Sequence, residues 1–155
     1  MSGEIKGVVI KRLQRFQDQR GWLVELFRHD EMDPEYHPAM SYVSQTQPGV
    51  ARGPHEHRDQ ADCFCFIGPS TFRIYLWDNR PESPTYQVHT RIEVGEDDPT
   101  LVIVPKGVVH GYKNVGKVDG VVYNAANRLF MGWGRKEPVD EIRHEADPAS
   151  PFKID

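Results

Sequence analysis

The sequence predicts an all-β fold, a sandwich or barrel of short strands. Short apolar segments alternate with turn residues along the whole chain, at a spacing typical of such folds. The 13 glycines and 12 prolines are spread through the sequence instead of forming one linker, which indicates many short elements. A chain of 155 residues without an internal repeat is most simply one domain, covering residues 1–155.

The strands are recognised by the alternation of apolar and polar side chains. Thr71–Trp77 alternates most clearly, because Phe72, Ile74 and Leu76 share one face of an extended chain. Cys63–Ile67 alternates as well, with its two phenylalanines on one face and its two cysteines on the other. The predicted strands, in chain order, are Gly7–Leu13, Trp22–Arg28, Ser41–Thr46, Cys63–Ile67, Thr71–Trp77, Tyr86–Val94, Thr100–Val104 and Gly120–Asn124.

Turns and short helices are expected between these strands. Gln17–Gly21 predicts a turn, and so does Asp78–Pro84, where Asp, Asn, Pro and Ser residues favour a structural role. Only Asp30–Tyr36 and Val139–Glu145 have the pattern of a helix, and both are short.

The charge and the apolar content exclude several classes of protein. There are 19 basic and 23 acidic residues, and the net charge of −4 argues against partners such as nucleic acid or a membrane surface. No apolar run approaches the ~20 residues of a membrane span, and Met1–Arg12 lacks a secretion signal. Cys63 and Cys65 are poorly spaced for a disulfide. Together these features predict a cytoplasmic protein.

Two segments with histidines are the most informative part of the chain. His55 and His57 are two residues apart, so that both project to one face if the segment is a strand, and Asp62 follows five residues later. The second segment, Pro105–Asn114, contains His110. The pair resembles the H-x-H and P-x-G-x-x-H-x-x-x-N motifs of the cupin superfamily. The resemblance implies a small double-stranded β barrel, or jelly roll, with these side chains pointing into its mouth.

The same four side chains are compatible with more than one chemistry. His55, His57, His110 and Asp62 offer three imidazoles and one carboxylate, a set suited to a divalent metal such as Fe, Mn, Ni or Zn. Without a metal, the histidines can serve as acids and bases. The third interpretation is that they are hydrogen-bonded structural residues.

Five further segments, in order, narrow the resemblance. They match D-x-R-G-x-F-x-E, G-V-x-R-G-x-H, D-x-R-x-x-S-P-T and A-H-G-F, followed by a tyrosine. In this chain they are Asp18–Glu25, Gly49–His55, Asp78–Thr85, Val109–Tyr112 and Tyr123. The sequence from Gly7 to about Tyr123 is therefore similar to the dTDP-4-dehydrorhamnose 3,5-epimerase family.

This resemblance implies proton chemistry beside a ketone. The substrate of the family is a nucleoside-diphosphate 4-keto-6-deoxy sugar, whose C3 and C5 hydrogens are acidic because the C4 carbonyl accepts the carbanion charge. A base removes a proton from one face and an acid returns one to the other, which inverts the carbon without a redox cofactor. We therefore expect an epimerase acting at C3, C5 or both, with no cofactor.

The resemblance also assigns roles to individual residues. His55 takes the position of the base and Tyr123 that of the acid. We also expect His57 and His110 to provide polar support at the sugar. Arg52 is implied to contact the diphosphate, which a planar guanidinium matches well.

A second group of residues is implied to bind the nucleotide. Arg20 and Glu25 match residues that reach into the site of the neighbouring subunit, which implies a homodimer. Leu23 replaces the Phe of the family, so that stacking on the base is lost there. Asp62 and Lys113 complete the predicted substrate-binding set.

The chain departs from the family pattern at the predicted centre of the site. Asp62 stands where the family has the lysine that stabilises the enolate, and His57 stands where it has glutamine. A charged His57 held by Asp62 can replace the lysine, or a divalent metal on the four residues can polarise the carbonyl. In the family the basic histidine is partnered by an aspartate of the C-terminal tail, for which Asp147 and Asp155 are the candidates here, and His144 is expected at the surface.

Two alternatives to the epimerase therefore stay open. One is a metal-dependent cupin enzyme that uses the three-histidine, one-aspartate site. The other is a cupin that binds a nucleotide sugar without catalysis.

Overall fold

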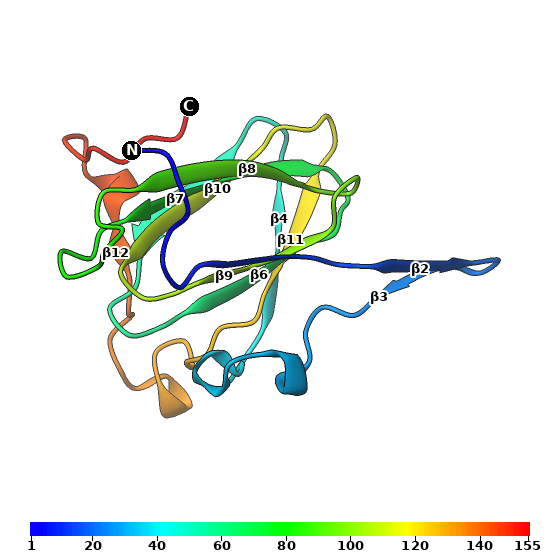
Figure 1. Cartoon of the computed structure of the whole chain (residues 1–155), viewed down its shortest axis with the longest axis horizontal. Helices are drawn as coiled ribbons and strands as arrows, with labels where there is room; N and C mark the ends of the chain where they lie inside the picture. The colour runs from blue at the N-terminus through cyan, green and yellow to red at the C-terminus, as the bar shows by residue number, and fades with distance from the viewer.

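The structure, a computed structural model, describes residues 1–155 and consists of two antiparallel five-stranded sheets that face each other (Figure 1). The first sheet has the order β1-β9-β6-β11-β4, with bounds Val9–Arg12, Thr100–Val104, Asp62–Phe66, Gly120–Asn124 and Tyr42–Thr46. The second has the order β12-β5-β10-β7-β8, with bounds Ile142–Arg143, Ala51–Glu56, Val108–Asn114, Thr71–Asp78 and His89–Gly95. The predicted all-β jelly roll is confirmed.

The core lies between the two sheets because alternate residues of each strand point inward. Phe64 and Phe66 of β6 meet Phe72 of β7 and Tyr112 of β10, with ring centroids 5.5–6.0 Å apart. Their edge-on and tilted arrangements are those that aromatic quadrupoles favour. The cluster borders on His110, whose ring lies 5.5 Å from that of Phe64. The apolar core therefore ends where the polar site begins.

Four strands were not among those predicted. They are β2, Arg15–Asp18, and the strands β5, β10 and β12. β5 contains Gly53–Pro54, a pair that by itself argues against a strand. Gly53 has a φ of +87°, and a Cβ there would lie 2.8 Å from the carbonyl oxygen of His110. Glycine thus lets β5 and β10 approach closely, and this pairing places His55 directly opposite His110.

The two predicted helices are not α-helices. Asp30–Tyr36 overlaps two 3₁₀ turns, η1 at His29–Glu31 and η2 at Pro34–Tyr36. The helix predicted at Val139–Glu145 is wrong, because Ile142 and Arg143 pair with the edge of β5 as β12. Two more 3₁₀ turns follow in the tail, η3 at Trp133–Arg135 and η4 at His144–Ala146. No helix in the chain has the length and apolar character needed to cross a membrane.

A two-stranded arm stands apart from the barrel. β2 pairs with β3, Gly21–Val24, and the hairpin projects away from both sheets (Figure 1). Its residues Phe16, Trp22 and Leu23 are 49%, 49% and 61% exposed. β3 is shorter than the strand predicted at Trp22–Arg28, since the chain beyond Val24 leaves the hairpin.

Two local predictions are confirmed by the contacts. Buried Asp78 accepts hydrogen bonds from Arg80, Ser83 and Thr85, so the Asp78–Pro84 segment is a structural turn. The two cysteines are free and buried on the outer face of β6.

Candidate active site

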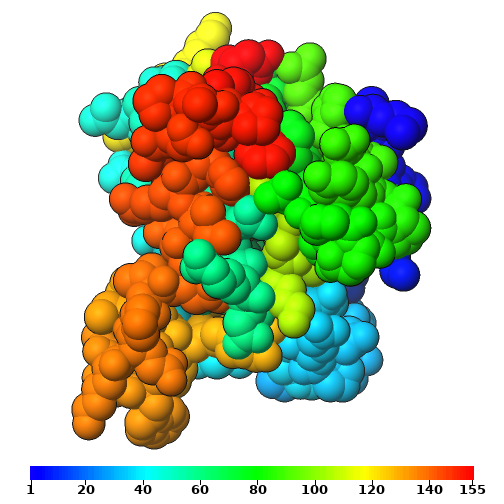
Figure 2. Space-filling model, turned by 90° about the vertical axis from the view of Figure 1, so that its left-hand side faces the viewer, coloured from blue at the N-terminus to red at the C-terminus, as the bar shows by residue number.

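A cavity of about 1160 Å³ opens at one end of the barrel. His55 and His57 belong to its lining, and the segment 126–141 supplies most of the remaining wall. In Figure 2 this segment, coloured orange, stands out from the body beside the teal segment that follows β5. The cavity is large enough for a ligand of drug size or above.

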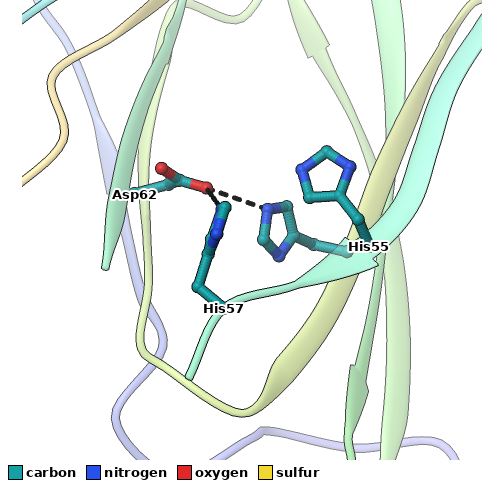
Figure 3. Close-up of side chains that lie close together, drawn as sticks. His55, His57 and Asp62 are labelled. Carbon is teal, nitrogen blue, oxygen red and sulfur yellow. Dashed lines mark hydrogen bonds and ion pairs between the residues drawn. The ribbon is translucent and has the colours of Figure 1, made fainter. Parts of the chain in front are cut away.

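The four residues singled out by the two histidine motifs come together on the barrel side of this cavity. β5 carries His55, His57 follows its end, β6 carries Asp62, and β10 carries His110. One potential ligand atom from each lies within 4.8 Å of the others. Figure 3 shows Asp62 facing His57 across the interior. Asp62 and His110 are each only 1% exposed.

Asp62 is fully engaged in hydrogen bonds. Its Oδ2 accepts from Nε2 of His57 and Nε2 of His110, each at 3.0 Å. Its Oδ1 accepts from Gln60 Nε2 at 2.8 Å and Asn124 Nδ2 at 2.9 Å. Burial alone would raise the pKa of Asp62, but the hydrogen bonds from the two histidines hold it well below the usual range. Asp62 is therefore an anion at neutral pH.

His57 is held as a cation by its two partners. Nε2 donates to the Asp62 carboxylate and Nδ1 donates to the backbone carbonyl of Asp140, so both ring nitrogens carry a proton. Burial acts to lower the pKa of His57, but the Asp62 hydrogen bond and charge outweigh it and raise the pKa to about 9. Asp140 itself is fixed by three backbone N–H groups of residues 58–60.

His55, unlike His57, is uncharged. Burial, followed by the neighbouring imidazoles of His110 and His57, lowers the pKa of His55 to about 3, so the ring is neutral at physiological pH. Its Nδ1 lies 3.6 Å from Oε1 of Glu141, and its Nε2 has no hydrogen-bond partner in the protein. A neutral imidazole with one free nitrogen and a carboxylate behind the other is suited to accept a proton.

The carboxylate beside His55 differs from both predicted candidates. Asp147 accepts from the backbone N–H of Ala149, and Asp155 bonds Tyr75 and Arg91 on the outer face of the second sheet. Glu141 lies beside His55 instead. The pairing of β12 with β5 aligns Arg143 with His55, and this brings Glu141, two residues earlier, to the same site. His144 is also not the surface residue predicted, since its Nε2 lies 2.9 Å from Glu56 Oε1 and its side chain is 16% exposed.

Tyr123, predicted as the acid, lies on the wrong face of β11. It packs with the outer cluster that contains Cys63 and Cys65, whereas its neighbours Val122 and Asn124 face the interior. Because side chains alternate along a strand, Tyr123 cannot share the cavity with His55.

Four predicted substrate-binding residues also lie outside the cavity. Lys113 projects from the outer face of β10 and donates to the carbonyl of Asp155. Arg52 donates to Thr46 Oγ1 and to the Gln45 carbonyl in a separate hollow of about 300 Å³. Arg20 pairs with Asp18 at the tip of the arm, and Glu25 lies 3.8 Å from Arg28.

Sequence reasoning missed several residues of the cavity wall. Tyr42, Asp140 and Glu141 line it, and Asn124 lies directly behind Tyr42. Alternation within Ser41–Thr46 places Tyr42 on one face of a strand, but it does not say which face is inward. The tail residues carry no motif at all, so no sequence signal was available for them.

The chain matches a family model described as dTDP-4-dehydrorhamnose 3,5-epimerase over residues 2–132. It is 38% identical over 128 residues to a probable low-salt glycan biosynthesis epimerase, Agl13, of Haloferax volcanii, covering 81% of each chain. The fold resembles a dTDP sugar isomerase of Desulfovibrio desulfuricans, with a TM-score of 0.81, 20% identity and coverage of 96% of this chain and 91% of that one. It also resembles an epimerase of Legionella pneumophila in complex with dTDP-4-keto-L-rhamnose, with a TM-score of 0.77, 20% identity and coverage of 99% and 83%.

Proposed function

Because this chain belongs to the dTDP-4-dehydrorhamnose 3,5-epimerase family, we propose that it inverts C3, C5 or both of a nucleoside-diphosphate 4-keto-6-deoxy sugar, with His55 as the base. The observation that carries the proposal is the neutral, half-enclosed His55 on the cavity wall, with a free Nε2 and with Glu141 at Nδ1. The nucleotide sugar in the Legionella relative supports this class of substrate.

The proton transfer follows from the electron demand of the ketone. The hydrogen on the carbon next to C4 leaves as a proton to His55 Nε2, and the electron pair of the C–H bond becomes an enolate on the C4 oxygen. Glu141 then faces an imidazolium and stabilises it, as a carboxylate beside a protonated histidine does. Return of a proton to the opposite face inverts the carbon.

The charged His57 is the proposed replacement for the family lysine. A carboxylate in the lysine position would repel an enolate if it were unpaired, but both oxygens of Asp62 are occupied by donors. What faces the cavity is the cationic ring of His57, whose centroid lies 5.5 Å from that of His55. A fixed positive charge near a developing oxyanion lowers the barrier.

We propose that the reaction needs no cofactor. The second candidate function is a metal-dependent reaction at the same four residues. The compact set of three imidazoles and one carboxylate favours the second candidate. Against it, a metal on the Nε2 atoms would remove the protons that now bind His57 and His110 to Asp62, and a metal on His55 would consume the base.

The test is deuterium incorporation from D₂O into a panel of nucleoside-diphosphate 4-keto-6-deoxy sugars, read by NMR with EDTA-treated protein. We expect deuterium at C3 or C5 together with inversion. Exchange that appears only after a stoichiometric metal is restored would replace the proposal with the second candidate. Binding of the sugars without exchange under either condition would identify a binding protein instead.

We propose a homodimer in which the arm docks on a second copy. Phe16, Trp22 and Leu23 present more exposed apolar surface than a free hairpin favours, and Arg20 is carried at the tip. The 17.8 kDa chain is expected to behave as a dimer in light scattering. Leu23→Asp should shift it toward the monomer, because an interfacial carboxylate would be buried unpaired.

The matched control for the arm is Val118→Asp. Val118 is 53% exposed but belongs to the loop between β10 and β11 and not to the arm. It should leave the dimer intact. A wild-type monomer, or equal effects of both substitutions, would contradict the proposed role of the arm.

We further propose that the protein acts in the cytoplasm and contributes to polysaccharide synthesis. Two buried free thiols are typical of a reducing compartment. The name of the Haloferax relative, a glycan biosynthesis epimerase, supports the second part.

A further inference from the structure

Inversion requires an acid on the face of the sugar opposite to the base, and the tyrosine predicted for this role lies outside the cavity. From the geometry of the cavity wall, we infer that Tyr42 is the proton donor that completes the inversion. The inference rests on the proposed function, and it names the second catalytic residue of the same site.

Tyr42 faces the base from the other sheet. It is the first residue of β4 in the first sheet, whereas His55 belongs to β5 in the second, and both line the same cavity. A planar enolate held between two facing sheets presents one face to each of them. His55 therefore takes a proton on one side, and Tyr42 is placed to return one on the other.

The hydrogen bonds around Tyr42 show that its hydroxyl hydrogen is not used within the protein. The Oδ1 of Asn124 accepts from the backbone N–H of Cys63 at 3.0 Å, which sets the orientation of the amide. Both hydrogens on Nδ2 are then committed, one to Asp62 Oδ1 and one to the Tyr42 oxygen, each at 2.9 Å. The phenol oxygen is thus an acceptor, and its own hydrogen has no acceptor in the protein. That hydrogen is free for a group in the cavity.

The surroundings of Tyr42 also keep its hydroxyl protonated, so that it has a proton to donate. Burial, and then the negative charge of Asp62, raise the pKa of Tyr42 above the ordinary phenol value, so the hydroxyl is protonated in the free enzyme. When the O–H bond breaks and a C–H bond forms, the enolate electron pair returns to carbon and Tyr42 becomes a phenolate. The Asn124 N–H stabilises that phenolate. Solvent then takes the proton from His55 and returns one to Tyr42, which restores the enzyme.

Tyr42→Phe and Tyr123→Phe form the matched test, since each removes one hydroxyl and keeps the ring. Tyr42→Phe should lower the rate of inversion by about 100-fold or more, the usual contribution of a general acid. Deuterium exchange into the uninverted substrate should persist, because His55 is intact. Tyr123→Phe should change neither rate by more than about 3-fold. Thermal melts of both variants check that the fold is retained.

The outcomes separate this inference from the proposed function. Inversion at the wild-type rate in Tyr42→Phe, or loss of exchange together with inversion, would overturn the role of Tyr42 while wild-type exchange still supports the epimerase. An equal loss in Tyr123→Phe would do the same. Absence of exchange in the wild-type protein would remove the proposed function and this inference together.

Discussion

Replacing His55 with asparagine is expected to reduce deuterium exchange at C3 and C5 by about 10²–10⁴-fold, the usual contribution of a general base. Asparagine keeps a polar group near Glu141 but offers no basic nitrogen to the cavity. Because His55 is neutral and contacts no protein group through Nε2, its removal should cost little stability. The measurement is the initial rate of exchange by NMR at saturating substrate.

The control for His55→Asn is His89→Asn. His89 is exposed at the start of β8 and does not line the cavity. It should retain the wild-type rate. The exchange rate of Glu141→Gln should lie between those of His55→Asn and His89→Asn, because the imidazolium loses its facing carboxylate but the base remains. If His55→Asn exchanges as fast as His89→Asn, the assignment of the base is wrong.

Asp62→Asn should destabilise the fold by about 3–5 kcal/mol, the usual cost of removing one partner of a buried ion pair. The carboxylate is 1% exposed and holds two histidines through one oxygen. Whichever way the new amide turns, its nitrogen would face N–H donors, either the rings of His57 and His110 or the side-chain amides of Gln60 and Asn124. For a chain of this length the melting temperature should fall by roughly 10 °C.

The pH dependence of the stability lost in Asp62→Asn tests whether the ion pair between His57 and Asp62 is its cause. His57 has a pKa of about 9 in the folded protein and near 6.5 when unfolded. Its pairing with Asp62 therefore contributes fully below pH 6.5 and is lost as the pH rises through about 9. The penalty of Asp62→Asn should be larger at pH 6 than at pH 9.5. Denaturant melts at the two values measure it, and a constant penalty would contradict the ion pair.

Asp59→Asn is the matched control for Asp62→Asn. Asp59 forms an exposed ion pair with Arg128 and lies only three residues away in sequence. Exposed pairs contribute about 0–1 kcal/mol, so the variant should melt close to the wild type at both pH values.

Strand alternation was a reliable guide where the two faces of a strand carry different kinds of side chain. β6 shows this, since Asp62, Phe64 and Phe66 face inward and the cysteines face outward as predicted. In β11 the neighbouring residues Val121, Val122 and Tyr123 are all apolar or aromatic, so alternation does not select the inner face. The pairing of Tyr123 with Cys65 makes the selection.

The carboxylate partner of His55 shows a second limit of prediction from the sequence. Glu141 lies 86 positions after His55 in a segment rich in charged and turn residues, and nothing local distinguishes it from Asp147 or Asp155. It reaches the site because two residues of the tail add a short strand to the edge of β5. Such an edge pairing uses backbone groups, which every sequence possesses.

By itself, the sequence determined the all-β class, the cluster of His55, His57, Asp62 and His110, and the likeness to a family of epimerases, because motif spacing and alternation are local properties of the chain. Only the tertiary structure decided which tyrosine enters the cavity, which carboxylate stands behind His55, and which histidine keeps a ring nitrogen free of protein partners. These depend on the register between strands and on buried hydrogen bonds to Asp62, and both join residues that are far apart in the sequence.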